Sequence, residues 1–176
     1  MAIKTFEELQ AGLAAPIRSA AAGVRGRDVV PNLFSDLNDS LFAVGGTMYL
    51  DADTPIDLTT AWQPFQWFSH SIDTKGLNED LAAGTFTTQT GAGGLYKVIT
   101  TIGILSTFSG WVQIALTKEG VPTPFKSKRT LVSGISGNIG VLGSGNIADG
   151  ETFGLAIRAS GAATVTCESG QLMAWR

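Results

Sequence analysis

Cysteine and histidine are almost absent from this 176-residue chain, which contains one of each, Cys167 and His70. A single cysteine forms no disulfide within the chain, which excludes a small secreted domain held together by disulfides. Zinc sites need three or four Cys, His or carboxylate ligands, so we predict no such metal centre. A catalytic triad would have to use His70, which lies among serines but without the strained turn of a G-x-S-x-G nucleophile. We interpret His70 as a polar residue of a strand end or loop and predict no catalytic residue.

Charge is scarce as well. Charged residues make up 15% of the sequence, against about 25% in ordinary soluble domains. The net charge is -3, which leaves no basic field for a phosphate backbone, so nucleic acid is not an expected partner. The mean hydropathy is +0.19, so much of the surface must be Ser, Thr, Gly and apolar side chains. Such a surface is usually covered by a partner or by copies of the same chain.

One long uncharged run, residues 98–117, has the length of a membrane span. It is rich in β-branched residues and is interrupted by Ser109 and Gly110, which favours two strands joined by a turn over membrane insertion. The first residues carry Glu7 and Glu8 where a signal peptide has an apolar core. We therefore expect synthesis and folding in the cytoplasm of the producing cell.

The first 45 residues differ from the rest. Thr5 and Glu8 have the spacing of a capping box, which predicts a helix that meets Pro16 and fades at the glycines beyond it. A second short helix is predicted over residues 31–42, where leucines recur every four positions. We predict a partly helical arm over 1–45 and a separate domain over 46–176.

From Thr47 onward the hydrophobic period is two, and turn residues recur at intervals of about eight to twelve positions. This pattern predicts an all-β fold, an antiparallel jelly-roll sandwich of about 8–10 strands. Phe153, Leu155 and Ile157 are expected to face inward along one of these strands. The candidate strands are 60–68, 84–90, 94–108, 111–118, 125–133, 135–142, 152–160 and 163–175.

The candidate strand 94–108 is apolar on both faces after its first turn. A strand of this kind is buried on both faces. Because a sandwich supplies one core, the second cover must come from another chain, which predicts an oligomer. We expect the interface to include Val98, Ile102 and Ile104, together with Trp111 of the next strand.

Four motifs occur in an order known from one family: Gly94-Leu95-Tyr96, WVQIALTKEG over 111–120, GETFGLAI over 150–157, and ESGQLMAW over 168–175. Together they resemble the trimeric jelly roll of tumour-necrosis-factor and complement globular-head domains, over about residues 54–176. In that family the Gly-x-Tyr strand lies near the threefold axis, which implies an interface role for Tyr96. The family's terminal aromatic positions are matched only in part, by Met173 and Trp175.

Animal members of this family are secreted behind signal peptides or collagen stalks, and this sequence shows neither. It resembles instead the bacteriophage branch, small virion proteins with a short amino-terminal anchor and a trimeric head. The resemblance implies a non-enzymatic homotrimeric capsid decoration protein, a cement or head-fibre protein, located in the virion after synthesis in the host cytoplasm. Its partners would be itself and the major capsid protein or another virion protein. The residues expected to anchor it are Phe6, Leu9, Leu13, Leu33, Phe34 and Leu37.

Two other functions stay open at this point. The first is the receptor-binding tip of a tail fibre, which would recognise a host surface glycan or protein through loops near 70–80 and 120–129. The second is a hydrolase, which needs paired carboxylates in a cleft. The close acidic pairs are Glu79 with Asp80 and Asp149 with Glu151, and direct neighbours on a strand point to opposite faces.

Two motifs resemble ligand sites. Residues 143–148 (GSGNIA) satisfy a dinucleotide fingerprint, but that site requires a helix next and the sequence continues as turn and strand, so no cofactor is predicted. Asp51, Asp53 and Asp57 could offer oxygens to calcium, but the glycine and bidentate glutamate of an EF-hand loop are missing. We favour a solvated loop there.

Two side-chain clusters complete the sequence. Lys126, Lys128 and Arg129 form the densest basic patch of residues 46–176. We interpret this patch as a solvated strand edge that deters aggregation. The alternative is that it binds an acidic capsid or a glycan. The aromatic cluster is interpreted as core and interface rather than as a sugar platform. Its members are Trp62, Phe65, Trp67 and Phe68.

Overall fold

The structure, a computed structural model, describes residues 44–176, one of the two units into which the chain divides. The predicted arm over 1–45 therefore lies almost entirely outside the described residues. So do the six predicted anchoring residues, Phe6, Leu9, Leu13, Leu33, Phe34 and Leu37. Over 44–176, no helix is long and apolar enough to cross a membrane. The uncharged run 98–117 forms two strands joined by a turn, as predicted.

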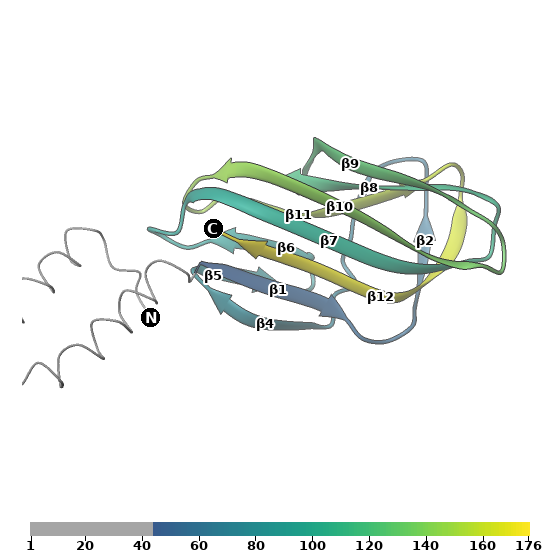
Figure 1. Ribbon diagram of the computed structural model, residues 1–176, viewed down its shortest axis with the longest axis horizontal. Helices are drawn as coiled ribbons and strands as arrows, with labels where there is room; N and C mark the ends of the chain where they lie inside the picture. The colour runs from purple at the N-terminus through teal and green to yellow at the C-terminus, as the bar shows by residue number, and fades with distance from the viewer. Residues whose placement is uncertain (1–43) are drawn as a thin grey trace, which may run out of the picture. The chain divides into compact units, whose positions relative to one another are not determined.

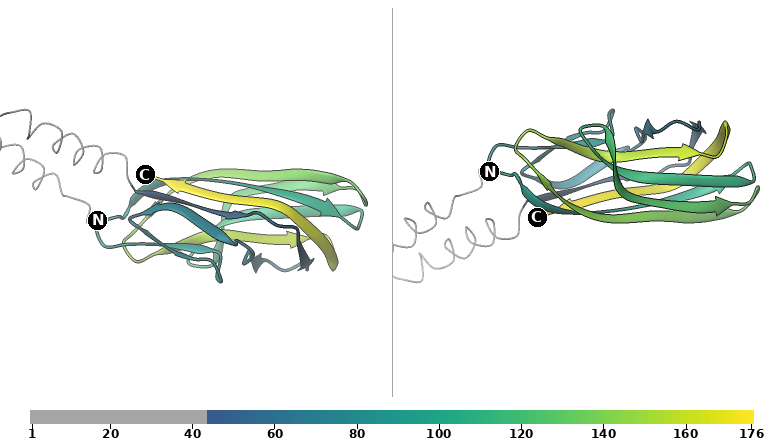
Figure 2. Two further views of the ribbon diagram at one scale, coloured as in Figure 1. Left: turned by 90° about the horizontal axis from the view of Figure 1, so that it is seen from below. Right: turned by 90° about the horizontal axis from the view of Figure 1, so that it is seen from above.

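Two antiparallel six-stranded sheets make up the described unit and face each other as the layers of a sandwich (Figure 2). Sheet A has the order β10-β7-β12-β1-β4, with β2 also paired to β12. Figure 1 shows these strands in this order from top to bottom. Sheet B has the order β5-β6-β11-β8-β9, with β3 also paired to β11. The all-β jelly-roll sandwich is confirmed. The strands are β1 (Gly45–Leu50), β2 (Thr54–Leu58), β3 (Gln63–Pro64), β4 (His70–Lys75), β5 (Leu77–Asp80), β6 (Thr85–Thr88), β7 (Gly94–Ser106), β8 (Gly110–Lys118), β9 (Val121–Leu131), β10 (Ser136–Ile147), β11 (Thr152–Ala159) and β12 (Ala163–Trp175).

The core lies between the sheets and follows the period of two. Phe153, Leu155 and Ile157 of β11 face inward and are at most 3% exposed, as predicted. Ring contacts join the two layers: the centroids of Tyr96 on β7 and Phe153 on β11 are 5.5 Å apart. Aromatic pairs at such distances add to the stabilisation that burial itself provides.

A tight turn fixes the hairpin of β8 and β9. Lys118 lies opposite Val121, which leaves Glu119 and Gly120 as a two-residue connection. Both have positive φ, 51° and 72°. This is the signature of the type I′ turn, whose twist matches that of the flanking strands. Glycine removes the steric cost of this conformation at the second position.

Side chains close the gap between the edge strands of the two layers. Phe125 and Arg129 of β9 lie over glycines of β10: a Cβ atom added to Gly143 would be 2.7 Å from the Phe125 ring, and one added to Gly137 would be 2.7 Å from the Arg129 guanidinium. Arg129 also donates a hydrogen bond to the carbonyl oxygen of Asn138. The glycines of β10 therefore make room for the side chains that seal this flank.

The predicted strand 60–68 is wrong. Only Gln63 and Pro64 pair there, with β11. Phe65 and Phe68 instead insert into the core from irregular chain, at 0% and 5% exposure. Proline lacks the amide hydrogen that a continuous ladder requires, and Pro64 interrupts the run.

Candidate association surface

One apolar row crosses the outward face of sheet A from edge to edge. Leu142 of β10 lies opposite Ile99 of β7, Ile99 lies opposite Met173 of β12, Met173 opposite Thr47 of β1, and Thr47 opposite Ile72 of β4. Five strands at the usual spacing make this row about 19 Å long. Leu142 is 63% exposed, Ile72 49% and Ile99 40%, whereas Met173 is half-buried and Thr47, the one polar member, is 8% exposed. We call these five residues the apolar row.

The neighbouring rows on the same face differ in character. On one side lie Thr101, Gln171, Tyr49 and His70 in register, and the rings of Tyr49 and His70 stack with centroids 5.2 Å apart. On the other side Lys97 lies opposite Trp175. Five of the nine exposed large hydrophobic residues of the described chain belong to this face: Ile72, Leu95, Ile99, Leu142 and Trp175. An apolar centre with a polar border is the composition of a protein interface.

None of the five residues expected at the oligomer interface lies on the outward face of sheet A. Tyr96, Val98, Ile102 and Ile104 point into the sandwich and are at most 6% exposed, which leaves them no surface for a second copy. Trp111 lies on the outward face of sheet B, opposite Thr130 of β9. The strand β7 does carry apolar residues on both faces, but the face that another chain can reach is that of Leu95 and Ile99. Alternation alone does not say which of two apolar faces is the inner one.

The single histidine does not form a catalytic triad. The Nε2 atom of His70 lies 2.9 Å from Oδ2 of Asp51, and Ser69 donates its hydroxyl to Oδ1 of the same carboxylate at 2.9 Å. The carboxylate thus lies between the hydroxyl and the imidazole, whereas a triad requires the imidazole between the other two. His70 is an exposed residue at the start of a strand, as predicted.

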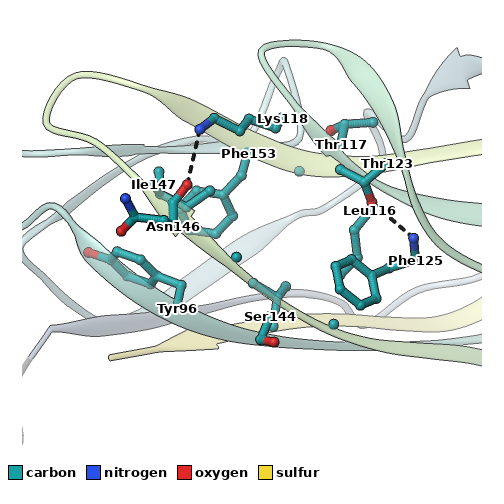
Figure 3. A pocket seen from close by; sticks show the side chains of 14 residues that line it. Tyr96, Leu116, Thr117, Lys118, Thr123, Phe125, Ser144, Asn146, Ile147 and Phe153 are labelled. Atoms are coloured by element: carbon teal, nitrogen blue, oxygen red, sulfur yellow. Dashed lines mark hydrogen bonds between the residues drawn. The ribbon is translucent and has the colours of Figure 1, made fainter.

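A small apolar cavity opens between β9 and β10. Its volume is about 70 Å³, and Tyr96, Leu116, Phe125 and Phe153 are among the residues that line it, with Lys118 at one end (Figure 3). A space of this size holds a few water molecules. Tyr96 donates its hydroxyl to the carbonyl oxygen of Ala92 at 2.6 Å. Burial raises the pKa of Tyr96 to about 12.

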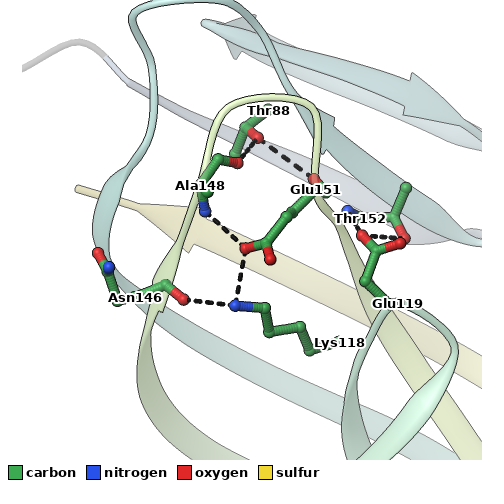
Figure 4. Close-up of polar contacts among 7 residues, drawn as sticks. All are labelled: Thr88, Lys118, Glu119, Asn146, Ala148, Glu151 and Thr152. Atoms are coloured by element: carbon green, nitrogen blue, oxygen red, sulfur yellow. Dashed lines mark hydrogen bonds and ion pairs between the residues drawn. The ribbon is translucent and has the colours of Figure 1, made fainter.

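The acidic pair Asp149 and Glu151 stabilises a turn. Asp149 accepts hydrogen bonds from the amides of Gly91 and Gly93 at 2.8 and 2.6 Å, and these bonds lower its pKa. Glu151 forms an ion pair with Lys118 at 2.7 Å (Figure 4), which together with the Ala148 amide lowers its pKa. A general acid needs a raised pKa instead.

The other acidic pair is also engaged locally. Glu79 accepts a hydrogen bond from the hydroxyl of Ser71 at 3.0 Å, and Asp80 accepts one from the amide of Ala83 at 2.9 Å. Neither pair therefore has the arrangement of an acid and a base on two sides of a cleft.

The two motifs that resemble ligand sites have structural roles. Residues 143–147 of the GSGNIA motif belong to β10 and are followed by a turn and β11, where a dinucleotide site would need a helix. Asp57 accepts a hydrogen bond from Thr164 at 2.6 Å, and Asp51 is engaged as described above. Within residues 44–176, no three His, Cys, Asp or Glu side chains gather closely enough to hold a metal ion.

The comparisons with known proteins give a fold and no family. No protein-family model matches the chain, and no curated protein does. Among solved structures, the chain shares the jelly-roll fold of tumour-necrosis-factor and complement globular-head domains.

Two of these structures show the extent of the likeness. "Eiger TNF from S. frugiperda" is 12% identical, with a TM-score of 0.52 over 77% of this chain and 92% of that one. The globular domain of the zebrafish complement 1qA protein is 10% identical, with a TM-score of 0.50 over 74% of this chain and 94% of that one. The jelly-roll fold expected from the sequence motifs is confirmed.

Sequence reasoning missed the apolar row because its members come from five strands. Thr47, Ile72 and Met173 are spread over most of the domain, and two of the strands that carry them, β1 and β4, were not among the predicted ones. The one available signal was in β7, where Leu95 and Ile99 alternate with Tyr96 and Val98. This pattern predicted that both faces of β7 are covered, but not which of the two faces points away from the core.

Proposed function

We propose that this protein is a non-enzymatic structural protein that works as a homotrimer, with the outward face of sheet A as its self-association surface. The observation that carries the proposal is the apolar row, whose exposed members Leu142, Ile99 and Ile72 lie on β10, β7 and β4 of that face. An isolated jelly roll leaves Leu142, Ile99 and Ile72 in water, and hydrophobic burial stabilises association in proportion to the apolar area covered. Three copies is the number implied by the resemblance of the sequence to trimeric jelly rolls.

We further propose that the trimer decorates a phage capsid, as a cement or head-fibre protein. Low charge, an all-β head and a preceding segment of about 45 residues support this role. Three arms on one trimer would bind a symmetric lattice together, which raises the avidity well above that of one contact. The anchoring residues of this proposal are Phe6, Leu9, Leu13, Leu33, Phe34 and Leu37.

The association surface can be tested by substitution. We expect the full chain to sediment as a trimer at micromolar concentration and Leu142→Asp to sediment as a monomer, because the row would then bury an unpaired carboxylate. Ile135→Asp is the matched control, since Ile135 is 58% exposed and lies outside this face. A monomeric parent chain, or equal behaviour of the two variants, would contradict the proposal.

The virion role needs a different measurement. Immunogold electron microscopy of the assembled particle, with an antibody raised against the full chain, is expected to place gold over the capsid. Gold confined to the tail would instead identify a receptor-binding fibre tip. Deletion of residues 1–43, which leaves β1 whole, should abolish capsid binding, and unchanged binding would contradict the proposed anchor.

A further inference from the structure

The outward face of sheet B carries a row of cations and tryptophans that are far apart in the sequence. Arg158 of β11 lies opposite Gln113 of β8, and Gln113 lies opposite Lys128 of β9. Trp111, two residues before Gln113, is on the same face. Trp62 immediately precedes β3, whose Gln63 pairs with β11 next to Arg158. We call these five residues the cationic strip.

Direct contacts hold the strip together. The Arg158 guanidinium lies 4.4 Å from the centre of the Trp62 ring and 5.7 Å from that of Trp111. The Lys128 ammonium lies 4.3 Å from the centre of the Trp111 ring. Arg158 also donates from Nε and Nη2 to Oε1 of Gln113, at 3.0 and 2.7 Å. Cation–π contacts and a forked hydrogen bond thus orient the side chains before any ligand arrives.

The strip offers hydrogen-bond donors and almost no acceptors. The Oε1 atom of Gln113 is used by Arg158, which leaves the Gln113 amide nitrogen and the remaining nitrogens of Arg158 and Lys128 as donors. Within residues 44–176, neither Arg158 nor Lys128 forms an ion pair with a carboxylate. A protein of net charge -3 therefore displays an uncompensated positive strip on one face.

The tryptophans narrow the class of ligand. Trp62 and Trp111 are each half-buried, so both residues keep some surface in solvent beside the cations that lie over their rings. An exposed aromatic surface accepts the C–H face of a pyranose ring, and a guanidinium binds a carboxylate with two parallel hydrogen bonds. A ligand that satisfies both has a sugar ring and a negative charge.

We propose that the cationic strip binds an acidic saccharide, a chain of pyranose rings that carry carboxylates. The carboxylate contacts Arg158 and Lys128, Gln113 donates its amide hydrogens to ring or hydroxyl oxygens, and the indoles contact the ring face. The strip lies on the sheet opposite the proposed association surface, so both can act in one assembly. The proposal does not depend on where in a particle the protein is located.

Direct titration of the full chain tests this proposal, with tryptophan fluorescence and calorimetry as readouts. The probes are oligogalacturonate, a neutral galacto-oligosaccharide of equal length, and an oligoglutamate of equal charge. We expect saturable binding of oligogalacturonate, at least about tenfold weaker binding of the neutral sugar, and similarly weak binding of oligoglutamate. Absence of binding to oligogalacturonate would overturn the proposal. Equal binding of oligoglutamate would replace it with a surface for acidic protein.

Two lysines of one strand provide the matched variants. Lys128→Gln removes the charge above Trp111 and should weaken oligogalacturonate binding about tenfold. Lys126 lies on the same face of β9, two residues away, and contacts no aromatic ring among the described residues. Lys126→Gln therefore removes an equal charge outside the strip and should weaken oligogalacturonate binding less than about threefold. Equal losses would show that net charge alone attracts the ligand, which would overturn the strip as a site.

A third variant separates shape from charge. Arg158→Lys keeps the positive charge but loses the planar fork that contacts Gln113 and the indoles. We expect binding to fall about tenfold while circular dichroism and oligomeric state stay as in the parent chain. Unchanged binding by this variant, once its fold is verified, would contradict the proposed carboxylate contact.

Discussion

Adjacent residues of β7 have opposite environments. Leu95 is 62% exposed and Tyr96 is 0% exposed. Both count as hydrophobic residues in the composition, yet Leu95 lies on the proposed association surface and Tyr96 lies in the core. The difference comes from the pleat of the strand, because successive side chains point to opposite faces. A substitution at one should therefore change self-association, and a substitution at the other should change stability.

Tyr96→Phe removes one hydroxyl and tests whether Tyr96 contributes to stability rather than to self-association. The change removes the hydrogen bond to the Ala92 carbonyl, and we expect the free energy of unfolding to fall by about 1 kcal/mol. Urea denaturation measures the loss. Sedimentation should show the oligomer of the parent chain, because the ring keeps its place between the sheets. A change of oligomeric state with unchanged stability would instead support the interface role that the sequence suggested for Tyr96.

The same variant has a signature at alkaline pH. Burial raises the pKa of Tyr96 from 10.0 to about 12, so the Tyr96 hydroxyl ionises at a lower pH in the unfolded chain than in the folded one. The contribution of this group to stability is complete below pH 10 and is lost as the pH rises from 10 to 12. Tyr96→Phe should lack this part of the alkaline loss.

At the scale of one strand, β10 shows how glycine shapes a flank of the sandwich. A Cβ atom at Gly143 would lie 2.7 Å from both Leu116 and Phe125, whereas one at Gly145 would have no neighbour within 4 Å. The two positions lie on the same face of the same strand. The difference is that Leu116 of β8 and Phe125 of β9 lie over Gly143, whereas no side chain lies over Gly145.

Gly143→Ala and Gly145→Ala form a matched pair on this strand. We expect Gly143→Ala to lower the free energy of unfolding by about 1 kcal/mol or more, because Phe125 must move away from the new methyl group. Gly145→Ala should be neutral or slightly stabilising, because it reduces the freedom of the unfolded chain without a clash. Thermal unfolding of both variants provides the measurement. A larger loss at Gly145 would contradict the described packing of Phe125.

The strands differ in how far the sequence predicts them. The long strands β7, β8, β11 and β12 are long runs of strand-forming residues bounded by turns, so their ranges were predicted to within two residues and the inward residues of β11 correctly. The short strands β1, β2, β4 and β5 have four to six residues each, and pairing with neighbours rather than local pattern makes them strands. β10 was predicted to end at Leu142 because its glycines indicate turns, but pairing with β7 continues to Ile147.

The two surfaces of the molecule were predictable to different degrees. The apolar second face of β7 indicated an oligomer from the sequence alone. The cationic strip was hidden, because Trp62, Trp111, Lys128 and Arg158 are separated by up to 96 positions (158 − 62) and only the order β3-β11-β8-β9 brings them together. Trp62 was interpreted as core and interface; it is half-buried rather than core, its ring contacts Arg158, and an interface role stays a prediction.

For the whole molecule, self-association should make stability depend on concentration. Because the proposed oligomer would cover the exposed residues of the apolar row, the folded state should gain stability by mass action as concentration rises. We expect the Tm of the parent chain to increase between micromolar and submillimolar concentration and that of Leu142→Asp to stay constant. Scanning calorimetry across this range checks the prediction. A Tm of the parent chain that does not move with concentration would argue for a monomer.

The position of β12 has a consequence for biosynthesis. This strand, residues 163–175, lies between β7 and β1 in sheet A, so a nascent chain that ends before it has two unconnected strand pairs in place of one sheet. Since domains fold as units during synthesis, neither the sheet nor its apolar row can form until these residues leave the ribosome. Association through this face therefore requires a chain in which β12 is already paired with β7 and β1.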